Sequence, residues 1–276
     1  MIKYLKIDVT LKPSSISPLP FIGSTIRGAF GVSLKKVVCI NPSFECDGCF
    51  AKDNCLFYDF YEQKNRAHQY RFDISLNPQN YDFTLYLFED ATEKLAIVVS
   101  ALYMMLTQQG LGINRDKFGI KSIFCNDIPI YVDGKIDISK VEAKIFEIDK
   151  VYERCSVKFI TPIRMKVQGK YIRTKPELQT LLYSILTRVN EIKDLPRIKL
   201  PFKPDYKESE AKVFFKDFDR YSNRQKSKMK FGGVLGKIEY VDLDVMSFKL
   251  LKLGEIIGVG KQTVFGLGKI EVKELI

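Results

Sequence analysis

The chain of 276 residues is long enough for two domains with a substantial core, and its 46% hydrophobic and 28% charged residues are ordinary for a globular protein. No apolar run reaches the roughly 18 residues of a membrane span, and the start MIKYLKIDVTLK alternates like a strand instead of forming a signal peptide, so we expect a cytoplasmic protein with no membrane partner. A formal net charge of +11 favours a polyanionic partner.

The excess positive charge lies in the second half of the chain. Residues 1–138 carry 15 Lys and Arg against 15 Asp and Glu, whereas residues 139–276 carry 29 against 18. Two stretches in this half, 157–176 and 221–236, contain no acidic residue. A lysine-rich thermophile surface would normally gain Glu together with Lys, which is not the case here. The pattern therefore predicts a C-terminal half that binds nucleic acid in a salt-dependent way.

The first half predicts the element order β-α-β-β-α-β. Residues 2–12 alternate like a half-buried strand, and Ile26, Phe30 and Leu34 fall near one face of a helix over 23–38 that Ser24 or Thr25 would cap. The expected elements that follow are strands over 70–76 and 83–88, a helix over 92–109 ended by Gly110, and a strand over 120–130. This order is that of the split ferredoxin-like unit.

The same order occurs again in the second half. We expect a strand over 156–167, a helix over 175–192 with Pro176 in its first turn, strands over 213–218 and 230–241, a helix over 246–253 and a strand over 264–272. The predicted fold class is therefore α+β, with two tandem ferredoxin-like, RRM-like domains: 1–138 with a cysteine-rich insert at 39–55, and a basic domain over 139–276 with a glycine-rich loop at 258–268. RNA-recognition modules expose such a sheet to single-stranded RNA, although an RNP-type stacking motif is missing from this sequence.

The glycine-rich loop reads GVGKQTVFGLG. Its glycines allow the backbone to approach a ligand closely and to adopt φ > 0, its N–H groups could form an anion-binding concavity, and Lys261 offers a point charge for a phosphate. The pattern is not that of a nucleotide P-loop. The glycine content alone fits a tight turn in a buried sheet equally well.

Four of the six cysteines, Cys39, Cys46, Cys49 and Cys55, fall within 17 residues, with a C-x-x-C in the middle. In a cytoplasmic protein this spacing indicates a structural zinc site, and Asp47-Gly48 supplies the tight turn. Disulfides and an iron–sulfur cluster are the alternatives. In each case the role is structural, because the crosslink would pin the excursion that ends near His68. Cys125 and Cys155 are expected to be isolated core residues.

Several segments together resemble one family, the CRISPR-associated RAMP endoribonucleases (the Cas-six family). These segments are IRGAFGVSLKKVVC, the cysteine cluster, LTQQGLGINRDKFGI, VKFITPIRMK, FDRYSNRQKSKMKFGGVLG and GVGKQTVFGLG, in the family's order and over most of the chain. The resemblance implies two ferredoxin-like domains with RNA bound across the cleft between them. It also implies cleavage of precursor CRISPR RNA within its repeats without a catalytic cofactor, by attack of a ribose 2′-hydroxyl that leaves a 2′,3′-cyclic phosphate. Many relatives carry a histidine shortly before the glycine-lysine pair of the last loop, where this chain has Gly258.

Such a reaction needs a base, an acid for the leaving 5′-oxygen and donors for the charged phosphorane. The sequence has a single histidine, His68, between the first helix and the second strand, where several family members place a catalytic histidine. We expect His68 to act as the base. Tyr58, Tyr61 and Lys64 are nearby candidates for the acid. The alternative is that His68 is a surface histidine ahead of a strand and has no catalytic role.

The expected RNA ligands come from three segments. Arg27 lies at the start of the first helix, where the helix dipole also favours a phosphate. The segment RYSNRQK offers arginines for phosphates and bases, amides for base edges and a tyrosine for stacking. The full set of predicted RNA ligands is Arg27, Arg220, Tyr221, Asn223, Arg224, Gln225, Lys226, Lys228, Gly260, Lys261, Gly266 and Gly268.

The sequence is also compatible with two other functions. One is a catalytically silent relative that binds repeat RNA and delivers it to a CRISPR effector complex, which the glycine at position 258 favours. The other is a structural RAMP subunit of such a complex, against which the RYSNRQ segment and the cysteine insert argue. Because many relatives form dimers, a homodimer is a further alternative.

Overall fold

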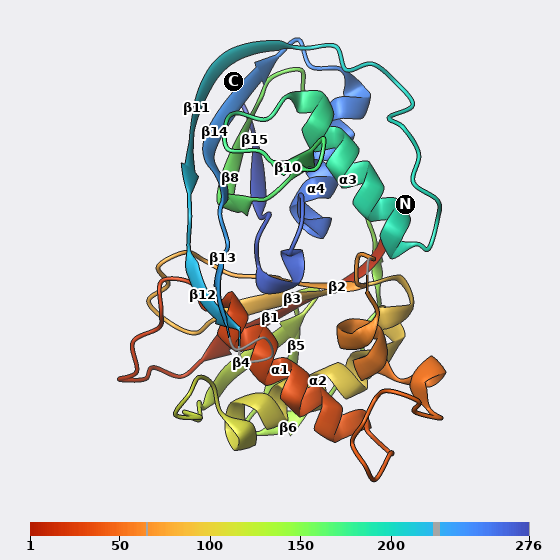
Figure 1. Ribbon diagram of the computed structural model, residues 1–276, viewed down its shortest axis with the longest axis vertical. Coiled ribbons are helices and arrows are strands. Elements are labelled where there is room, and N and C mark those ends of the chain that lie inside the picture. The colour runs from red at the N-terminus through yellow and green to blue at the C-terminus, as the bar shows by residue number, and fades with distance from the viewer. Residues whose placement is uncertain (65, 223–226, 276) are drawn as a thin grey trace. The chain divides into compact units, whose positions relative to one another are not determined.

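The computed structural model describes residues 1–64, 66–222 and 227–275. The chain divides into two compact units, Met1–Ile145 and Phe146–Ile276 (Figure 1). Each unit is built on a four-stranded antiparallel core sheet with two helices. The predicted α+β class with two ferredoxin-like domains is therefore confirmed.

The N-terminal unit has its core strands in the order β2-β3-β1-β4. Its core elements are β1 (Lys3–Leu11), α1 (Gly23–Val38), β2 (Tyr70–Asp73), β3 (Phe83–Phe88), α2 (Leu95–Met104) and β4 (Ile120–Cys125). The sheet continues past β4 through β5 (Ile128–Val132) and β6 (Lys135–Ile136), while β7 (Lys144–Ile145) pairs with the start of β1. The unit also contains two 3₁₀-helices, η1 (Lys52–Asn54) and η3 (Glu89–Lys94), and two π-helical segments, η2 (Tyr58–Glu62) and η4 (Met105–Gln109).

The alternation of β1 produces the two faces of this sheet. Leu5, Ile7 and Val9 are buried, with exposed fractions of at most 2%, while the side chains between them are half-buried. Phe30 of α1 packs edge-on against Phe72 of β2 with 5.6 Å between ring centroids, so the apolar face is the one that the helices cover. Burying each such side chain contributes roughly 1.5–3 kcal/mol, which is why the register of β1 is fixed.

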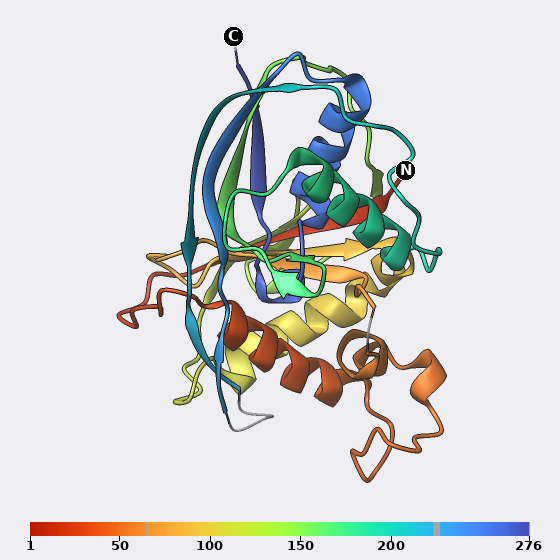
Figure 2. The same cartoon turned by 45° about the horizontal axis from the view of Figure 1, so that its top comes forward.

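The C-terminal unit repeats the topology with strand order β11-β14-β8-β15. Its core elements are β8 (Cys155–Ile163), α3 (Leu178–Ile192), β11 (Lys207–Lys216), β14 (Gly233–Val241), α4 (Val245–Ile257) and β15 (Ile270–Glu274). Helices α3 and α4 lie side by side on one face of the sheet (Figure 2). Two hairpins are added, β9–β10 (Lys166–Val167 and Lys170–Tyr171) after β8 and β12–β13 (Asp219–Ser222 and Ser227–Lys230) between β11 and β14.

Several predicted boundaries are wrong for local reasons. The strand expected over 120–130 is the hairpin β4–β5, which turns at Asn126 and Asp127 with φ of 49° and 72°, a conformation that Asn and Asp tolerate. Helix α1 begins at Gly23 with Ile22 at the N-cap position and without a capping side chain, so Ser24 and Thr25 lie inside it. Pro176 precedes Glu177, the N-cap residue of α3, instead of lying in the first turn.

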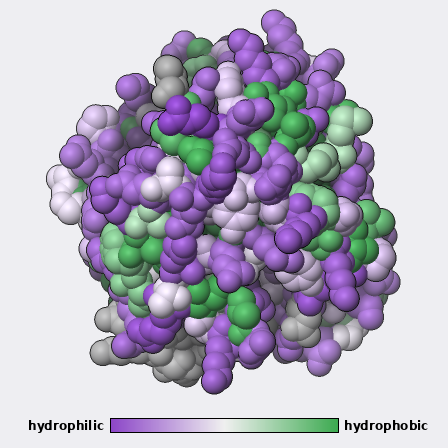
Figure 3. Space-filling view, turned by 90° about the horizontal axis from the view of Figure 1, so that it is seen from above, coloured by the Kyte–Doolittle hydropathy of each residue, from purple (hydrophilic) through white to green (hydrophobic). Residues whose placement is uncertain are grey.

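Within the described part of the chain, the helices are all too short or too polar to cross a bilayer. Figure 3 shows one face of the molecule, on which hydrophilic side chains predominate and hydrophobic ones gather in separate small patches. This surface agrees with a chain of which 28% of the residues are charged.

Candidate functional site

His68 lies in the segment between η2 and β2, and its half-buried ring is held by the backbone of η2. The ring atom Nδ1 is 3.0 Å from the carbonyl oxygen of Asp59. A carbonyl oxygen only accepts hydrogen bonds, so Nδ1 carries the proton in the neutral ring. The basic lone pair of neutral His68 is therefore on Nε2.

Tyr70 lies next to this ring and Arg27 and Tyr61 contact Tyr70 in turn; we call these three residues and His68 the histidine cluster. The rings of His68 and Tyr70 are 5.9 Å apart. Arg27 Nε donates to the Tyr70 hydroxyl at 3.2 Å, and the guanidinium carbon lies 4.4 Å from the centroid of the Tyr61 ring. The Tyr61 hydroxyl donates to the carbonyl oxygen of Arg27 at 2.7 Å. A cation, two phenols and an imidazole thus form one contiguous group.

A glycine on α1 makes room for this group. Gly31 follows Arg27 by four residues, so both lie on the same face of the helix. A Cβ atom at Gly31 would lie 2.5 Å from Cε1 of Tyr61, which is closer than real Cβ contacts come. On its other side, the Tyr61 ring stacks on Phe57 at 5.1 Å and an interplanar angle of 5°. The segment IRGAFG is therefore shaped to accept the Tyr61 ring.

Burial of the two phenols sets their protonation state. Burial raises the pKa of Tyr61 well above its ordinary value, and the neighbouring Tyr70 raises it further. Burial also raises the pKa of Tyr70, although Arg27 acts in the opposite direction. Both side chains are therefore neutral hydrogen-bond donors at physiological pH and cannot act as bases.

The structure separates the two other candidate acids from this cluster. Tyr58, the first residue of η2, lines a cavity with the four cysteines of the insert, and Lys64 is an exposed residue after η2. Sequence reasoning missed Tyr70 as a partner of Arg27. The available signal for Tyr70 was its position at the start of a strand facing the first helix. Tyr61 reaches Arg27 because η2 is π-helical, and this form has no sequence signature.

The four clustered cysteines are free thiols, and all of them line that cavity together with Lys35, Glu45, Lys52, Phe57 and Tyr58. Among the residues that the structure describes, no group of three or more His, Cys, Asp or Glu side chains is arranged to hold a metal ion. The cavity thus brings the four thiols to one place without the geometry of a closed metal site.

The glycine-rich loop is held mainly through its backbone N–H groups. The N–H groups of Val259, Gly260 and Lys261 donate to Gly268 O, Ser184 Oγ and Arg164 O, and Gly268 N–H donates to Pro162 O. These groups are consequently not available for the anion-binding concavity expected from the sequence. Gly266, a further expected ligand, caps η5 (Thr263–Phe265) in the left-handed region at φ 83°.

Two of the glycines are required sterically. Gly268 has φ 78°, and a Cβ there would lie 2.0 Å from the carbonyl oxygen of Val259. Gly260 has φ 80°, and a Cβ there would lie 2.6 Å from the carbonyl oxygen of Arg164. Lys261 is exposed and remains the charged group that the loop presents to solvent.

Arg164 connects three segments of the C-terminal unit that are separate in the sequence. Its carbonyl oxygen accepts the Lys261 N–H at 2.8 Å, and its Nη1 donates to the carbonyl oxygen of Gly232, which follows hairpin β12–β13. Its guanidinium carbon lies 3.8 Å from the ring centroid of Tyr171 on β10, and Lys166 Nζ lies 4.7 Å from the same centroid. The glycine-rich loop, hairpin β9–β10 and the residue Gly232 after hairpin β12–β13 therefore all contact one arginine.

The segment RYSNRQK is only partly described. Asn223, Arg224, Gln225 and Lys226 lie outside the described residues. Arg220, Tyr221 and Lys228 lie in the paired strands β12 and β13, where Tyr221 stands opposite Lys228. These residues form part of a hairpin between the two strands expected over 213–218 and 230–241.

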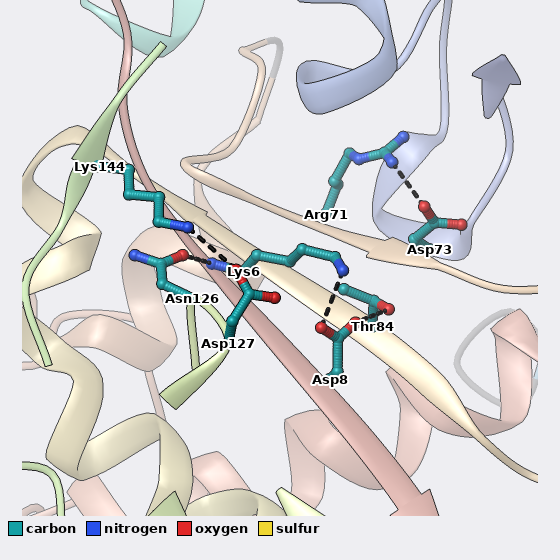
Figure 4. Close-up of polar contacts among 8 residues, drawn as sticks. All are labelled: Lys6, Asp8, Arg71, Asp73, Thr84, Asn126, Asp127 and Lys144. Atoms are coloured by element: carbon teal, nitrogen blue, oxygen red, sulfur yellow. Dashed lines mark hydrogen bonds and ion pairs between the residues drawn. The ribbon is translucent and has the colours of Figure 1, made fainter. Parts of the chain in front are cut away.

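The face of the N-terminal sheet opposite its two helices carries a set of polar contacts (Figure 4). Lys6 Nζ pairs with Asp8 Oδ2 at 2.9 Å, and the Thr84 hydroxyl donates to Asp8 Oδ1 at 2.6 Å. Arg71, with no exposed surface, pairs with Asp73 at 3.0 Å. Of the aromatic residues of this face, Tyr86 and Phe88 are at most 5% exposed and Tyr4 is half-buried, so base stacking on Tyr86 and Phe88 has little surface available.

Comparison with known proteins decides the family. The family model AF_1859_N, described as an N-terminal domain, matches residues 2–143, and the model for the CRISPR-associated endoribonuclease Cas6 matches residues 157–270. The chain belongs to the Cas6 family. The resemblance drawn from the sequence motifs is thereby confirmed, and the chain is a Cas6-family RNA-processing protein.

Solved Cas6 structures share the fold over the full length. A Cas6 product complex matches with 13% identity and a TM-score of 0.59, covering 99% of this chain and 100% of that one. A Thermus thermophilus Cas6 matches with 12% identity and a TM-score of 0.54, covering 99% and 98%. A Cas6-related protein of Pyrococcus furiosus matches with 14% identity and a TM-score of 0.53, covering 99% of each chain. In sequence, an uncharacterised protein of Archaeoglobus fulgidus is 24% identical over 92% of both chains.

Proposed function

We propose that this Cas6-family protein is an endoribonuclease that cuts precursor CRISPR RNA within its repeats and so produces mature guide RNAs. The reaction is attack of a ribose 2′-hydroxyl on the adjacent phosphate, without a metal ion. It forms a 2′,3′-cyclic phosphate and releases a 5′-hydroxyl. Family membership and the likeness to a Cas6 solved as a product complex support this function.

The fixed tautomer of His68 is the observation that carries the proposal. Because Nδ1 donates to Asp59 O, Nε2 is the nitrogen that takes the proton from the 2′-hydroxyl. The ring is half-buried, so it is held in place and still partly open to solvent. A positioned general base of this kind contributes typically about 10²–10⁴-fold to a rate.

Arg27 and the two phenols supply the remaining electrostatics in this proposal. The guanidinium of Arg27, placed by Tyr61 and Tyr70, offsets negative charge that develops on the phosphorane. The phenols, kept neutral by burial, donate hydrogen bonds and do not compete with His68 for protons. The proton for the leaving 5′-oxygen comes from an acid. Tyr61, Tyr58 and Lys64 are the candidates, and of these Tyr61 belongs to the histidine cluster.

RNA binding is assigned to the basic C-terminal unit. Around Arg164 the glycine-rich loop contributes Lys261, and hairpin β9–β10 contributes the exposed Lys166 and Lys170. Hairpin β12–β13, which contains Arg220, Tyr221 and Lys228, is followed by Gly232, whose carbonyl oxygen accepts a hydrogen bond from the same arginine. We propose that these segments contact the phosphates of the repeat.

The test is cleavage of end-labelled repeat RNA, transcribed from the CRISPR array of the source genome, in the presence of EDTA. The parent protein should make one discrete cut with a cyclic phosphate at the new 3′ end, and His68→Ala should bind the RNA but cut it at least 100-fold more slowly. Lys94→Ala, an exposed change on η3, is the control and should cut like the parent. A His68→Ala variant that cuts at the parent rate would remove His68 from the mechanism.

The geometry of Gly258 supports a second candidate, a silent relative that binds repeat RNA for an effector complex. Gly258 follows α4 with φ 78°, a conformation that disfavours histidine, at the place where many relatives have one. Binding of the repeat by the parent protein without any cut would select this candidate over the nuclease.

A further inference from the structure

The cysteine insert lacks an apolar core of its own. Within residues 39–55 no side chain is buried, and Ile40, Phe44 and Phe50 are 70%, 48% and 75% exposed. Six residues of the insert are partly buried, and four of these are the cysteines; the six are Cys39, Asn41, Cys46, Cys49, Ala51 and Cys55. The interior of this segment therefore consists mainly of thiols, and a segment without a hydrophobic interior needs another source of stability.

The backbone already has the turns of a metal knuckle. The Cys49 N–H donates to the Cys46 carbonyl at 3.3 Å, and Gly48 between them adopts φ 65°. The next two turns follow directly, with Lys52 N–H donating to Cys49 O and Cys55 N–H to Lys52 O. These turns, together with the end of α1 at Cys39, bring all four thiols to one cavity.

Charge at the cavity also suits a cluster of thiolates. Lys35 and Lys52 both line it, against one carboxylate, Glu45. The other two cysteines differ sharply, because burial in the strands of the two units raises the pKa of Cys125 and Cys155 to about 12. Those two thiols stay protonated, and only the insert offers four sulfur ligands together.

We propose that Cys39, Cys46, Cys49 and Cys55 bind one structural zinc ion. Zinc prefers a closed tetrahedron of four thiolates, and a single cavity shared by all four side chains suits one central ion. In the described geometry the side chains stop short of this arrangement, so binding requires them to rotate towards the centre of the cavity. Each cysteine that ligates zinc gives up its proton, so the affinity falls as the pH is lowered.

The zinc site also positions His68, and in this respect it rests on the proposed function. The carbonyl oxygen of Cys55 accepts the N–H of Asp59 at 3.0 Å, and the carbonyl oxygen of Asp59 holds Nδ1 of His68. Fixing Cys55 therefore fixes the start of η2. The cysteines act on the histidine cluster through this backbone path, without touching the reacting atoms.

The direct test is metal analysis of the full-length protein, purified under reducing conditions without chelator. One zinc per chain is expected, and Cys46→Ser and Cys49→Ser should each lose it, while Ser43→Ala in the same insert should keep it. Zinc content of the parent protein does not depend on the folding of any variant. Metal-free protein with four reactive thiols, two disulfides in place of the thiols, or iron with inorganic sulfide would each overturn the proposal.

Hydrogen exchange tests the positioning role separately from activity. Removal of zinc from the parent protein should increase amide exchange in 56–62 by at least ten-fold and leave exchange in α2 unchanged. Equal exchange with and without zinc would overturn the link to His68. Because zinc content and exchange are measured without RNA, their outcome is independent of whether the protein cuts the repeat.

Discussion

The histidine cluster and the glycine-rich loop are organised in opposite ways. In the cluster, side chains make most of the contacts: Arg27 donates to the Tyr70 hydroxyl and lies over the Tyr61 ring, while Tyr61 and His68 also donate to carbonyl oxygens. In the loop, backbone holds backbone, and Gly260 and Gly268 are needed because a Cβ would strike a neighbouring carbonyl. A substitution in the cluster can therefore abolish catalysis while the protein stays folded. A substitution of Gly260 or Gly268 can instead unfold the loop, so that its effect on RNA binding cannot be separated from its effect on stability.

The change with the largest expected effect is His68→Ala. Loss of the base should lower the single-turnover cleavage rate about 10²–10⁴-fold, with RNA affinity changed less than about three-fold, because catalysis is assigned to the cluster and binding to the C-terminal unit. Rapid-quench cleavage with saturating protein measures the rate, and fluorescence anisotropy measures the affinity. An equal loss of rate and affinity would contradict the division of roles.

Gly268→Ala should have the next largest effect, on stability. The new Cβ would meet the carbonyl oxygen of Val259 at 2.0 Å with the backbone at φ 78°, so we expect a loss of about 3 kcal/mol in the free energy of unfolding. Gly169→Ala is the matched control, since Gly169 has φ 80° with nothing within 4 Å, and should cost only about 1 kcal/mol. Urea denaturation followed by circular dichroism measures both, and equal losses would show that the loop does not pack as described.

Lys261→Ala tests how much the glycine-rich loop contributes to RNA binding. If Lys261 neutralises one phosphate, its removal should weaken RNA binding several-fold and reduce the slope of log K against log salt by about 0.7–0.9. Anisotropy titrations at several salt concentrations measure the slope. The control is Lys94→Ala, an exposed lysine of the N-terminal unit, and a slope equal for both variants and the parent would remove Lys261 from the interface.

Tyr61→Phe should have the smallest effect, on the pH dependence of stability. The phenol has a pKa raised by burial above its ordinary value of 10.0, so the folded state binds this proton more tightly than the unfolded state. Its contribution is present below pH 10 and is lost as the pH rises through the folded pKa, with a slope of up to about 1.4 kcal/mol per pH unit. Denaturation between pH 8 and 11 should show a shallower decline for Tyr61→Phe than for the parent. The exposed Tyr183→Phe should decline like the parent, and identical curves for all three proteins would contradict the buried phenol.

Most of the fold could be predicted because its signals are local. The alternation of β1 and the periodic apolar face of α1 repeat within a few residues, and each half shows the same order of elements. Hairpins β4–β5 and β12–β13 were missed because a tight turn at Asn126 and Asp127, or a charged strand pair, lacks a strong hydrophobic pattern.

The candidate site was only partly predictable. His68 stands out because it is the single histidine, and Arg27 because it precedes a glycine-rich helical segment. The partnership of Arg27 with Tyr61 and Tyr70 spans 34 and 43 residues and depends on the shape of η2, so spacing along the chain does not reveal it. The interpretation of the loop as an anion-binding N–H concavity was wrong because its N–H groups are already bonded to Arg164 O, Ser184 Oγ and Gly268 O. These acceptors are brought to the loop only by the folding of the chain.

The sequence by itself determined the two ferredoxin-like halves, the basic C-terminal domain, the cysteine spacing and the family, since these depend on composition, period and motif order. Tertiary structure alone decided which tyrosines surround Arg27 and which nitrogen of His68 is basic. It also decided that Lys261, Tyr171 and Gly232, from three separate segments, contact Arg164. The physical reason is that hydrogen bonds and ring contacts depend on distances of a few ångströms between residues far apart in the chain. Only the packed backbone sets those distances.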